Sequence, residues 1–268
     1  MNTSKLFRKL LDNTGSLKRL LLLSRLRHKY EGLGPQSVVK YLNYHIRITD
    51  GLSFYVQCKD EFIHRIYHFE AQRRDPLIID GGSNIGMSIL YFKKVYPEAR
   101  VIGFEPDPNI FGLLKENITR NKLEHVTLIS AGLGAEAGTT SFIKDDSAGG
   151  QFGQAENSIT VKVERLSEWL SEPVDFLKLN IEGEELPVLK EATESGKLDN
   201  VRELVLEYHG WPNGEQRLGD ILKLLDNAGF RYVIHDFDYE TGHATKPPFK
   251  LTPSTIWFAL VYAKRFRS

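Results

Sequence analysis

From residue 76 onward, short apolar segments alternate with segments of helical spacing, and this alternation limits the fold more than any other feature of the chain. Side chains on one face recur about every two residues along a strand and about every 3.6 along a helix. Strands are therefore predicted over residues 77–80, 100–105, 126–130, 139–143, 158–163, 174–180, 201–208, 230–235 and 255–262, and helices over 85–96, 109–121, 184–195 and 215–227. Such alternation predicts a doubly wound α/β sheet of the Rossmann-like class, mostly parallel, with helices on both faces. Because no helix separates the last two strands, we expect an antiparallel edge.

Residues 1–75 do not follow this alternation, and we expect them to form an appendage to a main domain of residues 76–268. Residues 1–30 hold eight Lys or Arg residues and one acid, a local charge of 8 − 1 = +7, with leucines interleaved at helical spacing. This pattern predicts two short basic amphipathic helices. They suit a cap over the core or a homodimer contact. Contact with a membrane surface or a polyanion stays open as the alternative.

The segment from Val38 to Gln57 predicts a β-hairpin. Apolar residues alternate on both sides of Asp50-Gly51, a dipeptide that favours the tight turn between two strands. A helix over residues 61–72 is then expected to lead to Asp75-Pro76, where the main domain begins.

Composition excludes several classes of protein. Lys and Arg together number 35, as do Asp and Glu, so the net charge is zero and nothing global indicates a nucleic-acid partner. The apolar run Leu20–Leu23 is far shorter than the roughly 20 residues of a membrane span or the about 7–15 of a signal peptide. The one cysteine, Cys58, cannot form an internal disulfide, which favours a reducing compartment. We therefore expect a cytoplasmic protein.

A glycine-containing loop, Asp80-Gly81-Gly82-Ser83-Asn84-Ile85-Gly86, follows the first strand of the main domain and opens a helix. Doubly wound sheets bind their ligands at this end of the strands. Gly82 and Gly86 let the backbone turn tightly and approach a ligand, and the free N–H groups of the helix start suit a carboxylate or phosphate. We predict that these glycines, with Ser83 and Asn84 between them, bind a nucleotide cofactor.

The acids beside this loop favour one kind of nucleotide. Asn84 replaces the central glycine of a dinucleotide loop, and Asp80 is expected to point into the crevice. Its carboxylate would repel a pyrophosphate and attract the sulfonium and ammonium groups of S-adenosylmethionine. Glu105, followed by Pro106, ends the next strand and is placed to accept hydrogen bonds from ribose hydroxyls. Ala131 ends the third strand, where an adenine contact is expected.

Two more strands end in polar residues at the same edge. The strand over residues 174–180 ends in Asn180 and is followed by Glu182, and the strand over residues 201–208 ends in Glu207 and is followed by His209. The carboxyl ends of parallel strands meet at one edge of a sheet. We therefore expect these four side chains around one point.

Together these motifs resemble the FkbM family of methyltransferases. The resemblance is carried by Asp80 to Gly86, Glu105-Pro106, Asp175 to Glu185 and Glu207-Tyr208-His209, and covers about residues 76 to 210. It implies a class I methyltransferase sheet and transfer of a methyl group from S-adenosylmethionine to a hydroxyl of a sugar, glycan or polyketide-like molecule. The family usually has Asp where this chain has Asn180, which weakens any metal or charge role at that position.

A hydroxyl acceptor must lose its proton during methyl transfer. His209 is the candidate general base, because histidine has an unperturbed pKa of about 6.5. Glu182 or Glu207 would orient His209 or take its place. Alternatively, these three residues could hold a divalent cation, and their oxygen ligands would favour Mg²⁺ over Zn²⁺.

The sequence leaves two alternative functions open. A nicotinamide-dependent oxidoreductase would share the sheet and Glu105, and an inactive methyltransferase-fold binding module would keep the cofactor residues.

The stretch from Phe237 to Pro253 suits a lid or acceptor-recognition loop, with a plain solvated loop as the alternative. His235, at the end of the sixth core strand, is a secondary candidate for the base.

Overall fold

The computed structural model describes residues 21–144, 150–153, 155–156, 158–211, 215–235 and 248–266. The chain divides into two compact units, Met1–Ile66 and Tyr67–Ser268. The larger unit thus begins earlier than the predicted boundary at residue 76. Phe69 explains the difference, because its ring stacks on that of Phe176 in the central sheet, with centroids 4.4 Å apart and an interplanar angle of 7°.

In the smaller unit, residues 21–30 are helical, and residues 1–20 of the two predicted basic helices lie outside the described residues. A hairpin is present, formed by β1 (Val38–Tyr41) and β2 (Tyr44–Arg47), but the prediction that it turns at Asp50-Gly51 is wrong. Asp50 instead caps helix α2 (Gly51–Gln57), accepting a 2.8 Å hydrogen bond from the backbone N–H of Ser53. The side chain satisfies an N–H group that the helix leaves unpaired, and this decides against the turn.

The helix predicted over residues 61–72 is also wrong. A π-helical segment (Cys58–His64) continues directly from α2 and stops at Arg65, whose φ of 59° is left-handed. The chain beyond it packs its aromatic side chains against the larger unit's sheet instead of continuing a helix, as Phe69 does.

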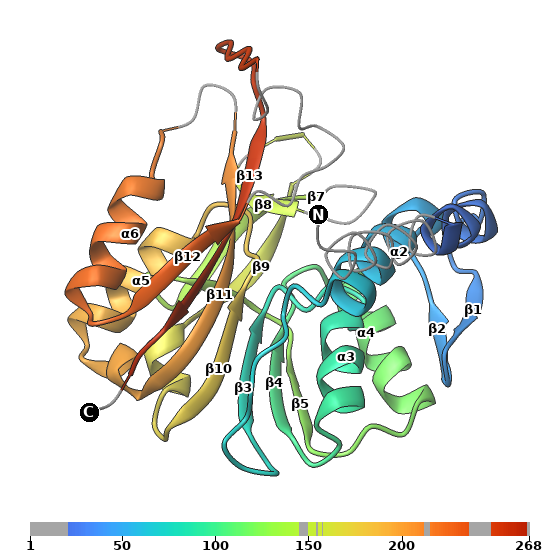
Figure 1. Ribbon diagram of the computed structural model, residues 1–268, viewed down its shortest axis with the longest axis horizontal. Helices are drawn as coiled ribbons and strands as arrows, with labels where there is room; N and C mark the ends of the chain where they lie inside the picture. The colour runs from blue at the N-terminus through green and yellow to red at the C-terminus, as the bar shows by residue number, and fades with distance from the viewer. Residues whose placement is uncertain are drawn as a thin grey trace, which may run out of the picture. The chain divides into compact units, whose positions relative to one another are not determined.

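A seven-stranded sheet forms the centre of the larger unit, in the order β12-β13-β11-β10-β3-β4-β5 (Figure 1). Its strands are β3 (Leu77–Gly81), β4 (Arg100–Phe104), β5 (Val126–Ile129), β10 (Val174–Leu179), β11 (Val201–Gly210), β12 (Arg231–His235) and β13 (Trp257–Lys264). The pairs from β5 to β11 are parallel, and β13 is antiparallel to both β11 and β12. The predicted doubly wound sheet with an antiparallel edge is confirmed.

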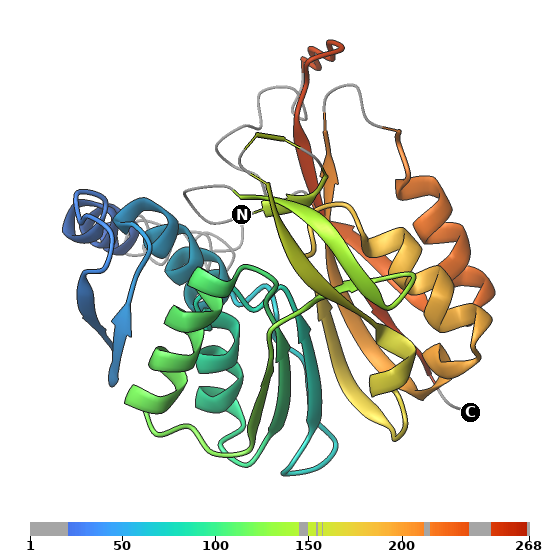
Figure 2. The same ribbon diagram turned by 180° about the vertical axis from the view of Figure 1, so that it is seen from behind.

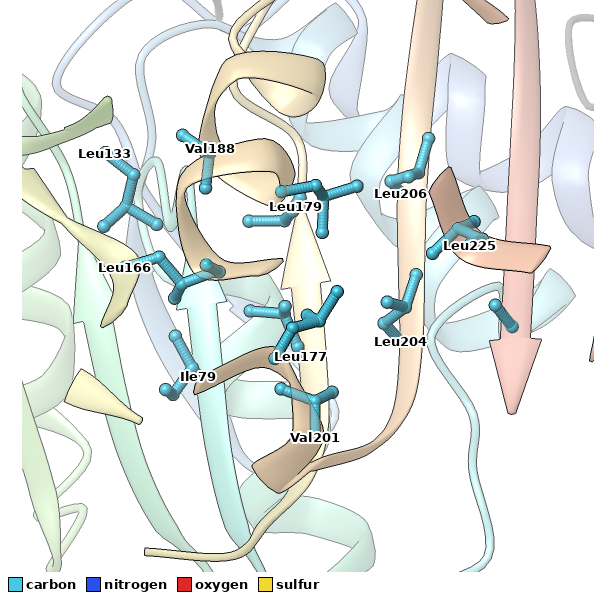
Figure 3. Packing of buried hydrophobic residues seen from close by; sticks show 14 of the residues in the cluster. Ile79, Leu133, Leu166, Leu177, Leu179, Val188, Val201, Leu204, Leu206 and Leu225 are labelled. Carbon is cyan, nitrogen blue, oxygen red and sulfur yellow. The ribbon is translucent and has the colours of Figure 1, made fainter. Parts of the chain in front are cut away.

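Helices cover both faces of this sheet, as predicted. Helices α3 (Met87–Val95) and α4 (Pro108–Arg120) lie on one face, and α5 (Glu185–Glu194) and α6 (Leu218–Asn227) on the other (Figure 1). Figure 3 shows the core between the sheet and the second helix pair, where Leu177, Leu179 and Leu204 are fully buried. These alternate strand positions point to one face, so their neighbours point to the other.

A smaller sheet follows β5 in the order β6-β9-β7-β8 (Figure 2). Its strands are β6 (Gly132–Gly134), β7 (Gly138–Lys144), β8 (Gly150–Phe152) and β9 (Ser158–Arg165), so the strand pair predicted over residues 139–143 and 158–163 is confirmed. Within the described residues, no helix has the length and apolar character needed to cross a membrane.

Candidate active site

Backbone hydrogen bonds hold the glycine loop at the carboxyl end of β3. The N–H groups of Gly82 and Ser83 donate to the carbonyl of Phe104, at 3.1 and 2.8 Å, and the hydroxyl of Ser83 donates to the carbonyl of Asp80 at 3.0 Å. Gly82 has a φ of +79°, and a Cβ on it would lie 1.9 Å from the carbonyl oxygen of Asn180. The loop therefore requires glycine here, because it runs in contact with the backbone that follows β10.

Gly86 starts helix α3 in the same left-handed conformation, with φ of 93°. A Cβ on it would lie 2.8 Å from Cδ1 of Leu114 in α4. The loop thus delivers the start of a helix, with its unpaired N–H groups, to the edge where β3 and β4 end. This arrangement matches the predicted cofactor loop.

The structure overturns the charge assigned to Asp80. Its carboxylate does not stand free in a crevice: the residue is fully buried, Oδ1 lies 3.0 Å from Nζ of Lys178, and Oδ2 accepts a 2.6 Å hydrogen bond from Ser88. Removing a lone carboxylate from water is costly, so a buried one is found with a cation partner. The pair is neutral as a whole and cannot by itself attract a cationic ligand.

Lys178 does more than neutralise Asp80. Its ammonium group also donates to the carbonyls of Gly81 and Gly82, at 3.2 and 2.5 Å. One buried side chain on β10 thereby joins the end of β3 to the glycine loop. The role of Asp80 is to hold this lysine in place.

Glu105 lies where a ribose-binding acid was predicted, but its carboxylate already has partners. Oε2 accepts from the N–H of Asn84 at 3.0 Å and Oε1 accepts from that of Asp107 at 2.9 Å. Burial raises the pKa of Glu105 to about 7, although these two hydrogen bonds oppose the shift. An ionised carboxylate offers about four acceptor positions, so two remain for ribose hydroxyls.

Donor binding should therefore weaken in acid. Below pH 7 the Glu105 carboxyl gains a proton and loses acceptor capacity, since its pKa is raised to about 7. We expect the affinity for S-adenosylhomocysteine, measured by calorimetry, to fall as the pH is lowered from about 8 to about 6. Glu105→Gln should remove this pH dependence, and an identical pH profile in the variant would contradict the assignment.

Other predicted cofactor residues lie along the same edge. Asn180 follows β10, its N–H donates to the carbonyl of Gly81 at 3.1 Å, and its buried Oδ1 has no hydrogen-bond partner among the described residues. An unused buried acceptor suits an ammonium group of a ligand. Ala131 is buried directly after β5, and a Cβ built on the adjoining Gly132 would lie 3.6 Å from Cβ of Pro106. Ala131 and Pro106 thus lie near each other at this edge of the sheet, where the sequence predicted an adenine contact.

The turn after β10 directs Glu182 toward β11. Glu182 and Gly183 both have positive φ, 55° and 110°, and the carboxylate of Glu185 accepts from the N–H groups of Ile181 and Gly183 at 3.0 Å each. A non-glycine residue in this conformation is held by its surroundings and is common at functional sites. Oε2 of Glu182 lies 3.6 Å from Nε2 of His209, so the sequence correctly predicted that these two residues meet.

Aromatic rings surround His209. Its imidazole stacks on Trp211, with centroids 5.4 Å apart and an interplanar angle of 10°, and meets Phe258 of β13 edge-on at 5.0 Å. Nδ1 is buried without a hydrogen-bond partner among the described residues. Burial lowers the pKa of His209 to about 4, so the ring is neutral at neutral pH.

Glu207 does not join His209 as predicted. Within the described residues its carboxylate accepts a hydrogen bond from the hydroxyl of Tyr67, and burial raises its pKa. The predicted trio of Glu182, Glu207 and His209 therefore does not converge, and no group of three or more His, Cys, Asp or Glu side chains in the described part of the chain could hold a metal ion. His235 ends the exposed strand β12, separated from β11 by β13, so it is no longer a candidate base.

Three residues of the site escaped the sequence analysis. The sequence did contain a sign of Lys178, because a lysine within a strand whose residues are all buried needs a charged partner. Tyr67 and Ser88 gave no such sign. Tyr67 reaches Glu207 from 140 residues away along the chain, and Ser88 reaches Asp80 from the first turn of α3, and neither contact follows from a local pattern.

Comparison with known proteins agrees with this geometry. Residues 80–232 match the family described as "Methyltransferase FkbM domain". The chain is 30% identical over 231 residues to Methyltransferase sdnD of Sordaria araneosa. This alignment covers 68% of this chain and 87% of that protein. The chain is 26% identical over 189 residues to the 2-O-methyltransferase NoeI of Sinorhizobium fredii, covering 61% and 76%. It is 32% identical over 165 residues to the hexuronic acid methyltransferase AglP of Haloferax volcanii, covering 59% and 65%.

Proposed function

The chain belongs to the FkbM methyltransferase family, and from this premise we propose that it methylates a hydroxyl oxygen of a sugar, glycan or polyketide-like molecule. As a member of this family it is an S-adenosylmethionine-dependent enzyme, and its sheet is a class I methyltransferase sheet. The names of NoeI and AglP, one a 2-O-methyltransferase and the other a hexuronic acid methyltransferase, support an oxygen acceptor on a sugar. Family membership favours neither the nicotinamide oxidoreductase nor the inactive binding module.

The pair of Glu182 and His209 is the observation that carries the proposal. Oε2 of Glu182 lies 3.6 Å from Nε2 of His209, and the neutral imidazole can accept one further proton. The hydroxyl proton of the acceptor passes to this pair as its oxygen attacks the methyl group and S-adenosylhomocysteine departs. The Glu182 carboxylate then stabilises the imidazolium, which offsets the burial that disfavours the charged ring.

The donor, when bound, supplies an electrophilic methyl group on a sulfonium. The residues of the chain position it: the glycine loop from Gly82 to Gly86 shapes the backbone, Glu105 accepts from the ribose, and Oδ1 of Asn180 accepts from the ammonium group. Positioning supplies most of the catalysis in a single displacement at carbon.

The proposed mechanism derives no step through a metal ion. Glu207 turns to Tyr67 instead of joining Glu182 and His209, so the Mg²⁺ ligand set suggested by the sequence does not fit the geometry. Turnover measured with and without EDTA tests this point.

We also propose that the protein is located in the cytoplasm, since Cys58 is a free, buried thiol.

His209→Ala should lower turnover by about 10²- to 10⁴-fold, the usual contribution of a general base. The affinity for S-adenosylhomocysteine should stay near that of the wild type, because the ring contacts of His209 are with Trp211 and Phe258. Turnover is measured as single-turnover methyl transfer and affinity by calorimetry. Normal turnover would show that the proton leaves by another route.

The acceptor class is tested by mass spectrometry. Candidate sugars, glycans and hydroxylated metabolites are incubated with the protein and a methyl donor labelled in its methyl group. We expect a labelled O-methyl ether on a sugar hydroxyl, and His209→Ala serves as the background control. A labelled methyl group on a nitrogen or carbon atom of the acceptor, or no labelled product from any hydroxyl compound, would overturn the proposal.

A further inference from the structure

The acids at the carboxyl end of the central sheet differ in what neutralises them. Asp80 pairs with Lys178, Glu105 accepts from the N–H groups of Asn84 and Asp107, and Glu185 accepts from those of Ile181 and Gly183. Each of these three carboxylates thus meets a cation or two backbone N–H groups. Glu182 faces the neutral ring of His209, but its side chain is 22% exposed, so water can solvate its charge.

Glu207 differs from these acids. The residue is 7% exposed, and the contact found for its carboxylate within the described residues is a hydrogen bond from the hydroxyl of Tyr67. Burial raises its pKa, while that hydrogen bond and the charge of Lys178 act in the opposite direction. Glu207 is thus a buried carboxylate whose charge is not matched by a cation in direct contact, and such a charge is costly unless something else compensates it.

The fold places Glu207 at the same edge of the sheet as the glycine loop. Leu179 pairs with Leu206 in the parallel register of β10 and β11, so Asn180 and Glu207, the next residue on each strand, are neighbours. Asn180 donates its N–H to the carbonyl of Gly81 at the start of the glycine loop. With the adenine at Ala131 and the ribose at Glu105, as proposed, the rest of the donor would extend toward β10 and β11, because the strand order is β11-β10-β3-β4-β5.

A chain of contacts also connects Glu207 to that loop. The hydroxyl of Tyr67 bonds Glu207, and the ring of the same tyrosine lies 5.4 Å from Nζ of Lys178, which holds the carbonyl of Gly82. Asp80, Lys178 and an ionised Glu207 have formal charges of −1, +1 and −1. One positive charge from a ligand would balance them and would favour the ionised form of Glu207.

We propose that Glu207 is the counter-charge for the sulfonium of the donor, a positioning residue that makes the site distinguish charged S-adenosylmethionine from its uncharged product. The proposal rests on the donor half of the proposed function and is independent of the acceptor. S-adenosylhomocysteine differs from S-adenosylmethionine by the methyl group and its positive charge. A carboxylate beside the sulfur therefore favours the substrate and helps release the product.

The experiment compares three ligands by calorimetry: S-adenosylmethionine, sinefungin, which carries an amine near the sulfur position, and S-adenosylhomocysteine, which is neutral there. Glu207→Gln keeps the shape and can still accept from Tyr67. We expect it to weaken the two cationic ligands by about tenfold relative to the neutral one. The measured quantity is the ratio of affinities, which a general loosening of the site would leave unchanged.

Two matched controls come from the same sheet. Glu203→Gln makes the same change on β11, at a fully buried carboxylate already paired with Arg202 and Lys264, and should leave the ratio at its wild-type value. Glu105→Gln should weaken all three ligands alike, because each carries the ribose. If Glu207→Gln does not fold, Tyr67→Phe removes the hydrogen bond that favours the ionised carboxylate and should shift the ratio in the same direction.

An unchanged ratio in Glu207→Gln, or in Tyr67→Phe where that variant stands in, would overturn the role of Glu207 and leave the methyltransferase assignment intact. A wild-type protein that binds none of the three ligands would overturn both. A labelled product without an O-methyl ether would instead contradict the acceptor proposal alone.

Discussion

Gly82→Ala should weaken donor binding by about a hundredfold or more. The φ of +79° is a conformation that alanine adopts reluctantly, and the added Cβ would lie 1.9 Å from the carbonyl oxygen of Asn180, which is backbone and cannot rotate away. The loop must therefore move away from β10. Because Lys178 and the carbonyl of Phe104 hold the loop, its displacement also breaks hydrogen bonds there. A misplacement of about 1 Å is enough to cost on the order of a hundredfold.

Calorimetry with S-adenosylhomocysteine measures this effect, and thermal unfolding without ligand shows whether the variant folds. Gly112→Ala is the matched control: Gly112 lies inside helix α4, and a Cβ there meets nothing within 4 Å. That change should leave affinity unchanged and raise stability by roughly 0.5–1 kcal/mol. Donor affinity within a factor of about three of the wild type in Gly82→Ala would contradict the loop's assignment.

Lys178→Met should destabilise the larger unit by about 3–5 kcal/mol, since breaking a buried ion pair from one side leaves an uncompensated charge. The side chains of Lys178 and Asp80 are 3% and 0% exposed, so water does not screen the charge that remains. The variant also loses the hydrogen bonds to the carbonyls of Gly81 and Gly82. We therefore expect weaker donor binding together with the loss of stability.

Chemical denaturation gives the free energy of unfolding for this variant. Lys190→Met is the control, because Lys190 and its partner Glu194 are 67% and 68% exposed and their ion pair should matter little. The double variant Asp80→Asn with Lys178→Met should recover much of the stability, since neither charge remains. A Lys178→Met protein as stable as the wild type would mean that Asp80 is held by other contacts.

Local patterns predicted the elements of the larger unit well. Strands β3, β4, β5, β10 and β11 and helices α3, α4, α5 and α6 all lie where apolar alternation and helical spacing placed them. These segments are long enough, and buried enough, for periodicity to indicate their type. The glycine loop was found for the same reason, because a strand, two glycines at fixed spacing and a helix start are all local features.

Asp50-Gly51 shows where local patterns fail. The same two residues can make a tight turn or begin a helix, and here the hydrogen bond from the N–H of Ser53 to Asp50 favours the helix. Propensity alone does not separate these outcomes. The pairing of Glu182 with His209 could be predicted because Glu182 follows β10 and His209 lies at the end of the neighbouring β11. The hydrogen bond between Tyr67 and Glu207 could not, because residue 67 precedes the sheet and has no periodic signal.

Asp80 shows most clearly what the sequence determines and what the three-dimensional packing determines. Its position at the tip of β3 follows from the order of residues along the chain, because a buried strand must end where a polar residue and glycines begin. Its charge state and partners follow from the three-dimensional packing, which brings Lys178 from β10 to within 3.0 Å. Electrostatic interactions depend on distance and on exclusion of water, and neither quantity is contained in sequence spacing. Chain order thus determined the sheet, the loop and the candidate residues. Packing decided which acids are neutralised, and it leaves Glu207 without a cation in direct contact among the residues that the structure describes.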